Sequence, residues 1–143
     1  MAYLLDSDVF IQAKNLHYGL DFCPAFWDWL IASNASGQVL SVEKVGDEIN
    51  KGKDALTAWA APRGAGFFLK PDNAILPAFG VLSQWAAAQQ YDPAAVNKFL
   101  QSTDYYLIAH ALAYGHVVVT HEKSAPAAKK SIKIPDACNG VGV

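Results

Sequence analysis

Residues 3–10 read Tyr3-Leu4-Leu5-Asp6-Ser7-Asp8-Val9-Phe10 and join a short apolar run directly to a helical pattern. The run predicts a buried strand over residues 3–5, followed at once by a helix over residues 8–15. Asp6 stands at the C-terminal end of this strand, where α/β proteins bind their ligands. A carboxylate is costly to bury unless something uses it, so Asp6 is the first candidate site residue.

The rest of the chain continues this alternation of short apolar strands and helices. Further strands are expected at 38–42, 67–69, 116–120 and 132–134, and helices at 23–35, 43–51, 54–60, 73–90, 93–100 and 103–114. Such alternation predicts a parallel sheet with helices on both faces. The expected fold is a three-layer α/β/α sandwich with a central parallel sheet of four to five short strands, formed by residues 1–143 as a single domain.

Composition fits one folded domain with a substantial core, because 52% of the 143 residues are apolar and 17% are charged. No window of 18 uninterrupted apolar residues is present and no signal peptide is visible, so we expect no membrane span and a cytoplasmic location. Cys23 and Cys138 show no zinc-binding spacing. Free thiols in a reducing cytoplasm are the preferred interpretation, and pairing stays open.

The net charge of −2 argues against a nucleic-acid partner, because phosphate neutralisation normally requires a basic surface. A local basic group is nevertheless present near the C-terminus, formed by Lys123, Lys129, Lys130 and Lys133. This group is either a basic patch or a solvated loop and strand end.

Several acids follow the ends of the expected strands or begin the helices beside them. Parallel strands place their C-terminal ends at one edge of the sheet, so these side chains are expected near Asp6. They are Glu48, Asp104, Glu122 and Asp136, with Thr120 beside them. Clustered carboxylates repel one another unless a cation is present, and hard oxygen ligands suit Mg²⁺ or Mn²⁺.

Each acid also has a structural interpretation. Asp104 fits the dipole of the helix that it begins, and Asp8 is best explained as the cap of the first helix. Glu48 fits an exposed helix position, and Glu122 fits an exposed loop. Asp136, which follows a proline, fits a helix cap.

Other catalytic patterns are not evident. No Ser-His-Asp or Cys-His constellation stands out, and Gly64-Ala65-Gly66 precedes a strand rather than the helix that a phosphate loop requires. His110 lies about 240° around its helix from Asp104, so it is expected to face away from that acid. Trp29 lies off the apolar stripe of its helix and is a candidate for contact with a partner or a base.

Four motifs together resemble the PIN-domain family. They are Leu4-Leu5-Asp6-Ser7-Asp8-Val9, the Val45-x-x-Glu48-Ile49 helix, the Asp104-x-x-Leu107-Ile108-Ala109 helix, and Val118-Val119-Thr120-His121-Glu122. Their order and spacing cover nearly the whole chain. Residues 6–15 with 26–30 further resemble a PIN-like branch of unassigned function.

The resemblance implies a PIN-like fold and a metal-dependent ribonuclease similar to the VapC toxins of toxin–antitoxin pairs. By position, Asp6, Glu48 and Asp104 would be the metal-binding acids. Glu122 would be the fourth, at a position where PIN proteins more often carry Asp. Thr120 would orient a water or the carboxylates, and Asp136 competes for the fourth place.

The expected activity is therefore that of an Mg²⁺- or Mn²⁺-dependent endoribonuclease that hydrolyses RNA with a metal-activated water. RNA is the expected substrate, and the resemblance suggests a homodimer and an antitoxin partner. One alternative is a PIN-fold module with weak or lost catalysis that binds protein or RNA. Another is a metal-dependent phosphatase or DNA nuclease that uses the same acids.

Overall fold

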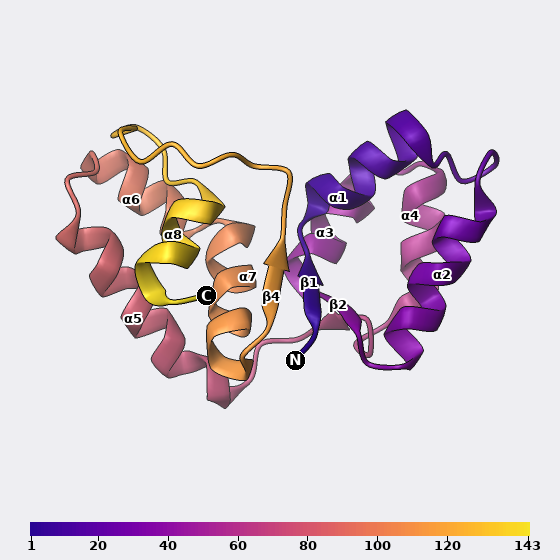
Figure 1. Ribbon diagram of the computed structural model, residues 1–143, viewed down its shortest axis with the longest axis horizontal. Coiled ribbons are helices and arrows are strands. Elements are labelled where there is room, and N and C mark those ends of the chain that lie inside the picture. Colours follow the sequence, from indigo (N-terminus) through magenta and orange to yellow (C-terminus); the bar gives the residue numbers. More distant parts are fainter.

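Four short parallel strands form one sheet in the order β3-β2-β1-β4 (Figure 1). The strands are β1 (Tyr3–Leu5), β2 (Val39–Val42), β3 (Phe68–Leu69) and β4 (Val117–Val119). The computed structural model describes the backbone of residues 1–143 and every side chain except that of His17. β1 pairs with β2 on one side and with β4 on the other, with Leu5 opposite Val119. The C-terminal ends of β1 and β4 therefore lie side by side.

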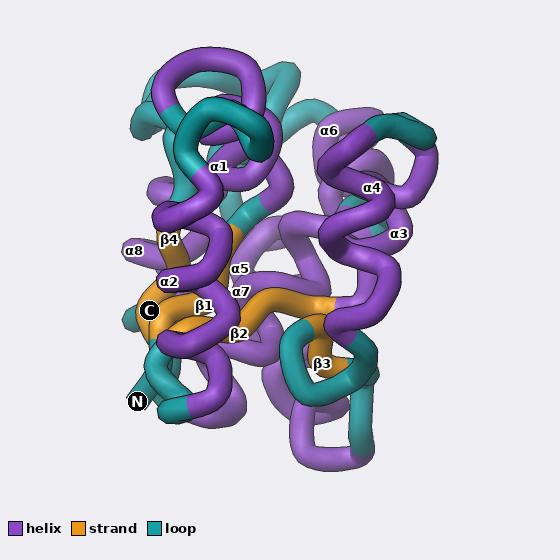
Figure 2. The backbone as a smooth tube through the Cα atoms, turned by 90° about the vertical axis from the view of Figure 1, so that its right-hand side faces the viewer, coloured by secondary structure: helices purple, strands orange, loops and turns teal.

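Helices cover both sides of this sheet, which confirms the expected three-layer α/β/α architecture (Figures 1 and 2). One group of helices is α1 (Ser7–Gln12), α2 (Pro24–Ala35), α3 (Glu43–Lys51) and α4 (Ala55–Ala60). The other group is α5 (Leu76–Ala88), α6 (Pro93–Leu100), α7 (Thr103–Tyr114) and α8 (Ile134–Val141). Short segments are the π-helix η1 (Ala13–His17) and the 3₁₀ turns η2 (Ala61–Arg63) and η3 (Asn73–Ile75).

Local signals fix both ends of α7, the helix that carries Asp104. Ser102 is its N-cap, and the Ser102 hydroxyl oxygen accepts a hydrogen bond from the Tyr105 backbone N–H at 3.4 Å. Gly115 ends the helix with φ of +70°, a left-handed conformation that glycine adopts without steric cost. These two caps place Asp104 in the first turn, at the same level as the C-terminal ends of the strands.

The core lies on both faces of the sheet. On the side of α3 and α4, the fully buried ring of Phe10 packs against Trp59 and Phe68, with ring centroids 6.0 Å and 6.2 Å away. On the other side, Leu107 and Ile108 of α7 are completely buried. Burial of such side chains contributes roughly 1.5–3 kcal/mol each to folding, so both helix layers are held firmly against the strands.

The expected strand over residues 132–134 is wrong. Lys133 is instead the N-cap of α8, and Pro135 lies in the first turn of that helix. Proline is well suited to this position because its missing N–H has no intrahelical partner there. The sheet accordingly has four strands, and Asp136 belongs to the first turn of a helix.

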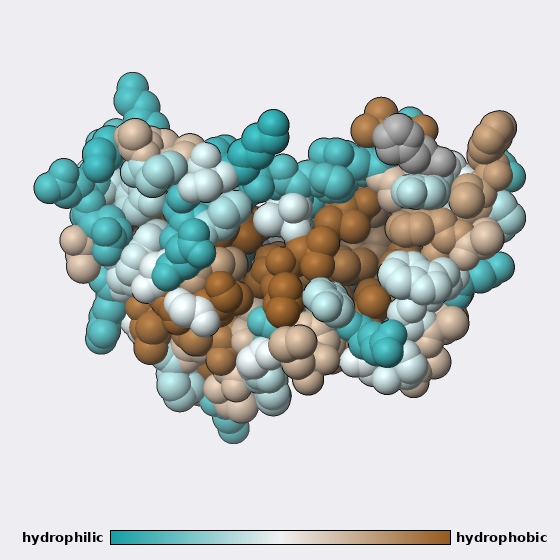
Figure 3. Space-filling model, viewed as in Figure 1, coloured by the Kyte–Doolittle hydropathy of each residue, from teal (hydrophilic) through white to brown (hydrophobic). Residues whose placement is uncertain are grey.

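The molecular surface shows hydrophobic side chains across the middle of one face, over the region of β1 and β4 (Figure 3). Among the described residues, none of the helices combines the length and apolar character needed to cross a membrane. Cys23 and Cys138 are both unpaired, as expected.

Candidate functional site

Asp6 is held in place by the strand before it and the helix after it. Its backbone N–H donates to the Val119 carbonyl at 3.0 Å, which extends the pairing of β1 with β4. Its side chain caps α1, because Oδ1 accepts a hydrogen bond from the Ser7 backbone N–H at 2.8 Å. The residue is only 5% exposed. The carboxylate is therefore fixed at the edge of the sheet where β1 and β4 end.

Asp8 and Thr120 lie directly beside Asp6. Thr120 Oγ1 is 3.0 Å from Asp6 Oδ2 and 3.2 Å from Asp8 Oδ2, and the His121 backbone N–H donates to Asp8 Oδ2 at 3.0 Å. The expected capping role of Asp8 is therefore wrong, since Asp6 caps α1 and Asp8 contacts the residues after β4. Asp8 Oδ1 is buried and has no hydrogen-bond partner among the described groups.

Asp104 is electrostatically coupled to the acids at this edge. Burial, followed by the charges of nearby acids, raises the pKa of its carboxyl group from 3.8 to about 7. These neighbours are Asp6, Glu122, Glu48 and Asp8, in order of decreasing effect. A carboxylate placed only for the helix dipole would have a lowered pKa. Burial is thus the largest cause of the raised Asp104 pKa, and crowding with other acids adds to it.

Asp6 shows the same behaviour. Burial, followed by the charge of Asp8 and, less strongly, that of Glu122, raises its pKa from 3.8 to about 6. Hydrogen bonds from the Ser7 backbone and the Thr120 hydroxyl act in the opposite direction and do not outweigh burial. Two carboxyl groups with pKa values near neutrality therefore occupy one edge of the sheet, which is an unusual arrangement without a compensating cation.

Glu48 and Glu122 reach this edge from α3 and from the segment after β4. Glu48 is exposed, and its Oε1 accepts a hydrogen bond from the Thr103 hydroxyl at the start of α7. Glu122 Oε2 accepts a hydrogen bond from the Ile134 backbone N–H at 2.8 Å. Both side chains thus tie their segments to the start of a neighbouring helix in this structure.

Asp136 has a different environment. Its Oδ1 accepts a hydrogen bond from the Ser124 hydroxyl, and its Oδ2 accepts one from the Ala125 backbone N–H at 2.8 Å. Its charge raises the pKa of Tyr91 and is not among the causes of the Asp104 shift. Asp136 therefore anchors the 124–125 loop to α8, whereas Glu122 is the acid after β4 that is coupled to Asp104.

The donor chemistry of the cluster suits a hard divalent cation, because every candidate ligand is a carboxylate oxygen. The unpartnered Asp8 Oδ1 and the raised pKa values of Asp6 and Asp104 also favour a positive charge at this place. Within the described part of the chain, no three His, Cys, Asp or Glu side chains are arranged to hold a metal ion as they stand. Coordination would therefore require the carboxylates of the cluster to move closer together.

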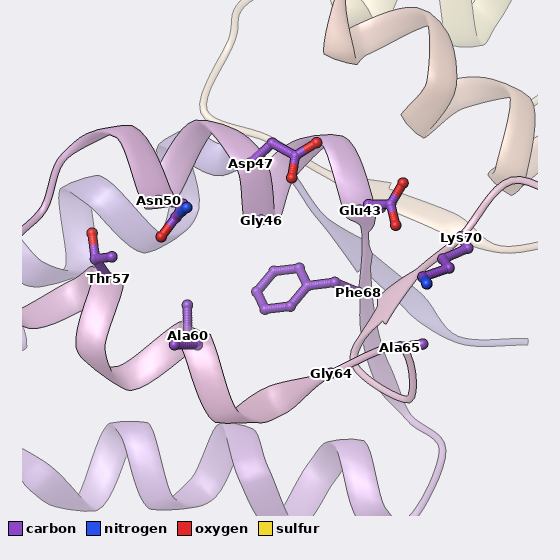
Figure 4. A pocket seen from close by; sticks show the side chains of 11 residues that line it. Glu43, Gly46, Asp47, Asn50, Thr57, Ala60, Gly64, Ala65, Phe68 and Lys70 are labelled. Atoms are coloured by element: carbon purple, nitrogen blue, oxygen red, sulfur yellow. The ribbon is translucent and has the colours of Figure 1, made fainter.

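A separate cavity of about 460 Å³ lies between α3, α4 and β3 (Figure 4). The ring of Phe68 projects into it between the two helices, and Asp47 and Asn50 line it from α3. Glu48 lies on the opposite face of α3, roughly 200° around the helix from Gly46 in the cavity wall. None of the carboxylates coupled to Asp104 lines this cavity, so it is distinct from the acidic cluster.

Sequence reasoning missed Thr103 and underrated Asp8. Thr103 precedes Asp104 directly and bonds to Glu48 across 55 positions of the chain. The sequence signal for this contact was the run Ser102-Thr103-Asp104. The Ser102 hydroxyl caps the helix, so the Thr103 hydroxyl is available to bond to another element.

Comparison with protein-family models gave a match over nearly the whole chain. A family model described as "Domain of unknown function (DUF4411)" matches residues 3–143. This range includes every strand and helix of the structure. No curated protein and no solved structure matched the chain.

Proposed function

The chain belongs to the family defined by the domain of unknown function DUF4411, and we propose that it is an Mg²⁺- or Mn²⁺-dependent endoribonuclease of PIN type. The observation that carries the proposal is the gathering of carboxylates at this edge. Asp6 and Asp8 share the Thr120 hydroxyl, and burial, followed by the charges of Asp6, Glu122 and Glu48, raises the pKa of Asp104 to about 7. Carboxylates gathered at the C-terminal edge of a parallel sheet lie where α/β proteins bind ligands, and their repulsion is relieved by a divalent cation.

The chain's own residues would share the work as follows. Asp6, Asp104 and Glu122 would hold the cation, with Glu48 as the fourth catalytic acid and Asp8 in support. When bound, the cation would supply an activated water and neutralise charge on the phosphodiester. Thr120 would keep Asp6 and Asp8 oriented, because its hydroxyl lies within 3.2 Å of both carboxylates. A carboxylate that is not engaged with the cation would accept the proton of the attacking water.

The choice of RNA as substrate follows from the PIN resemblance of the motifs around Asp6, Glu48, Asp104 and Glu122. The same resemblance supports a toxin of a toxin–antitoxin pair, acting as a homodimer in the cytoplasm with an antitoxin partner. The net charge of −2 requires that the phosphate backbone be met mainly by the cation and by local lysines.

The direct test is cleavage of single-stranded RNA by the purified protein in Mn²⁺, with and without EDTA. Asp104→Asn should reduce the rate about a hundredfold or more, as expected when charge stabilisation at a reacting phosphate is lost. Asp47→Asn is the matched control, because Asp47 is an exposed acid of α3 outside the cluster. Cleavage that persists in EDTA and in Asp104→Asn would contradict the proposed activity.

A PIN-fold binding module with weak catalysis is the second candidate. This candidate is favoured by the hydrogen bonds of Glu48 with Thr103 and of Glu122 with the Ile134 backbone, because they give both acids a structural role. A thermal-shift titration with Mn²⁺ separates the two candidates, since a ligand that binds only the folded state raises the melting temperature. A ribonuclease should gain stability in Mn²⁺ and lose that gain in Asp104→Asn. A binding module without a metal site should show no gain in either protein.

A further inference from the structure

A second, smaller cavity lies next to the acidic cluster, between α1, η1 and the segment after β4. It has a volume of about 270 Å³ and is lined largely by apolar side chains, including Val9, Tyr18 and Phe26. Two polar side chains, Gln12 and His121, also line it. Its walls thus combine aromatic and aliphatic surface with hydrogen-bonding groups, a composition typical of small-molecule sites.

This cavity lies beside the acids. Val9 in its wall follows Asp8 in the chain, and His121 in its wall donates its backbone N–H to Asp8 Oδ2 at 3.0 Å. A phosphodiester held at the acids through the proposed cation would therefore have its neighbouring nucleotide close to the cavity.

Two stacked aromatic rings form part of the wall. The rings of Tyr18 and Phe26 lie face to face at a centroid distance of 4.6 Å and an interplanar angle of 15°. Trp29, which is 56% exposed and lies outside the cavity wall, has its ring 6.2 Å from that of Phe26. Aromatic side chains grouped in this way are the usual stacking partners of unpaired bases.

The polar groups of the wall suit the edge of a base. The side-chain amide of Gln12 forms no hydrogen bond with any other residue that the structure describes, and it carries both a donor and an acceptor. The imidazole of His121 adds a further donor or acceptor at the side nearest to the acids. Base edges in single-stranded RNA are read by hydrogen bonds of this type.

We propose that this cavity binds the base of the nucleotide adjacent to the phosphodiester at the acidic cluster, with the base against the aromatic pair of Tyr18 and Phe26 and its edge facing Gln12 and His121. The inference rests on the proposed ribonuclease function and adds the means by which a single-stranded substrate is positioned. Stacking supplies affinity that does not depend on a basic surface, which agrees with a chain of net charge −2.

The test compares two probes by fluorescence anisotropy: a labelled single-stranded RNA and an abasic oligomer with the same ribose-phosphate backbone. Ca²⁺ serves as the cation in place of Mn²⁺. Phe26→Leu should weaken binding of the RNA by about fivefold to a hundredfold, the usual range for loss of base stacking. The same variant should leave binding of the abasic oligomer unchanged. Phe22→Leu is the matched control, because Phe22 is 92% exposed and lies outside the cavity wall.

The outcomes separate this inference from the ribonuclease proposal. Equal loss for both probes, no loss for either, or no binding of RNA by the unmodified protein would overturn the base-binding role. If binding of both probes falls equally, or binding of neither falls, and RNA is still cleaved, the ribonuclease proposal stays intact. Base-dependent binding without cleavage would support the cavity and overturn the activity. A change of oligomeric state in Phe26→Leu, seen by sedimentation, would identify the cavity as a protein interface and contradict base binding.

Discussion

Thr120 Oγ1 lies 3.0 Å from Asp6 Oδ2, so the residue after β4 supports the residue after β1 through its side chain. The hydrogen bond from this hydroxyl lowers the pKa of Asp6, against the larger effect of burial. The same hydroxyl oxygen accepts a hydrogen bond from the Glu122 backbone N–H at 3.1 Å, which fixes its position. Thr120 is thus the link between the two strand ends and the carboxylate that they present.

Replacement of this threonine by valine should shift the titration of Asp6. Thr120→Val keeps the shape of the side chain but removes its donor, so the Asp6 pKa should rise above its value of about 6. The free energy of unfolding should fall by about 1 kcal/mol, the usual net value of one hydrogen bond. Carboxyl-carbon NMR of the metal-free protein measures the pKa. Thr120→Ser, which retains the hydroxyl, should behave as the unmodified protein, and an unchanged Asp6 pKa in Thr120→Val would contradict the role.

Titration of Asp6 should lower the free energy of unfolding of the metal-free protein as the pH rises from about 4 to 7.5. The pKa of Asp6 is 3.8 without perturbation and about 6 in the fold. Over this interval the folded state therefore binds more protons than the unfolded chain, and deprotonation favours unfolding. At about 1.4 kcal/mol per pKa unit, the Asp6 contribution amounts to roughly 2–3 kcal/mol. Asp54 and Asp72 have lowered pKa values, so their effects fall below this interval. Burial lowers the pKa of His110 and of His116, and these two groups favour folding as the pH rises, so the contribution of Asp6 is obtained by comparison with a variant that lacks it.

Urea unfolding in EDTA at pH 4, 6 and 7.5 measures this dependence. Asp6→Asn removes the titrating group, so its free energy of unfolding should decline less with pH than that of the unmodified protein. Parallel profiles for the two proteins would show that Asp6 does not titrate as described. Addition of Mn²⁺ should oppose the decline, because a cation favours the ionised carboxylates.

Glu122 and Asp136 should respond differently when their charges are removed. Glu122→Gln retains an acceptor for the Ile134 backbone N–H but removes the charge that raises the Asp104 pKa. It should lower the Asp104 pKa and reduce the gain in melting temperature produced by Mn²⁺. Asp136→Asn should lower the free energy of unfolding by about 1–2 kcal/mol through loss of an acceptor in the 124–125 loop. In Asp136→Asn, the gain in melting temperature produced by Mn²⁺ should stay unchanged. If Asp136→Asn lost this gain and Glu122→Gln kept it, Asp136 would be the fourth acid.

Gly140 should not tolerate a larger residue. A Cβ atom at Gly140 of α8 would lie 2.1 Å from Trp85 Nε1 of α5, so Gly140→Ala should force the two helices apart. The expected loss is about 1–3 kcal/mol, as for other overpacked cores. Gly80→Ala is the matched control, because a Cβ there meets nothing within 4 Å and alanine is the better helix former. Gly80→Ala should stabilise by about 0.5–1 kcal/mol, and thermal unfolding measures both variants.

Local signals in the sequence were sufficient to predict most of the fold. The bounds of α3 and α7 agree with the expected ranges, because an apolar repeat and a terminal glycine define each helix. The region of Pro135 was misread because proline both interrupts a strand and favours the first turn of a helix. Only the packing of Ile134, which is 1% exposed at the start of α8, decides between these uses.

The positions of the acids were predictable, but their partners were not. Asp6 and Asp104 were placed at the strand edge by the strand and helix that carry them. The contact of Asp8 with Thr120 spans 112 positions of the chain, and no local pattern encodes it. The direction of the side chains in such contacts depends on the tertiary packing of β1 against β4. Periodicity and capping patterns in the sequence do not reveal it.

The position of β4 beside β1 has a consequence for the timing of synthesis. Asp6 is synthesised 114 residues before Thr120. A nascent chain cannot assemble the acidic cluster until residue 120 has left the ribosome, because domains form as units once their paired strands are available. For the proposed ribonuclease, this order keeps the cluster incomplete while the residues between Asp6 and Thr120 are being made beside ribosomal and messenger RNA.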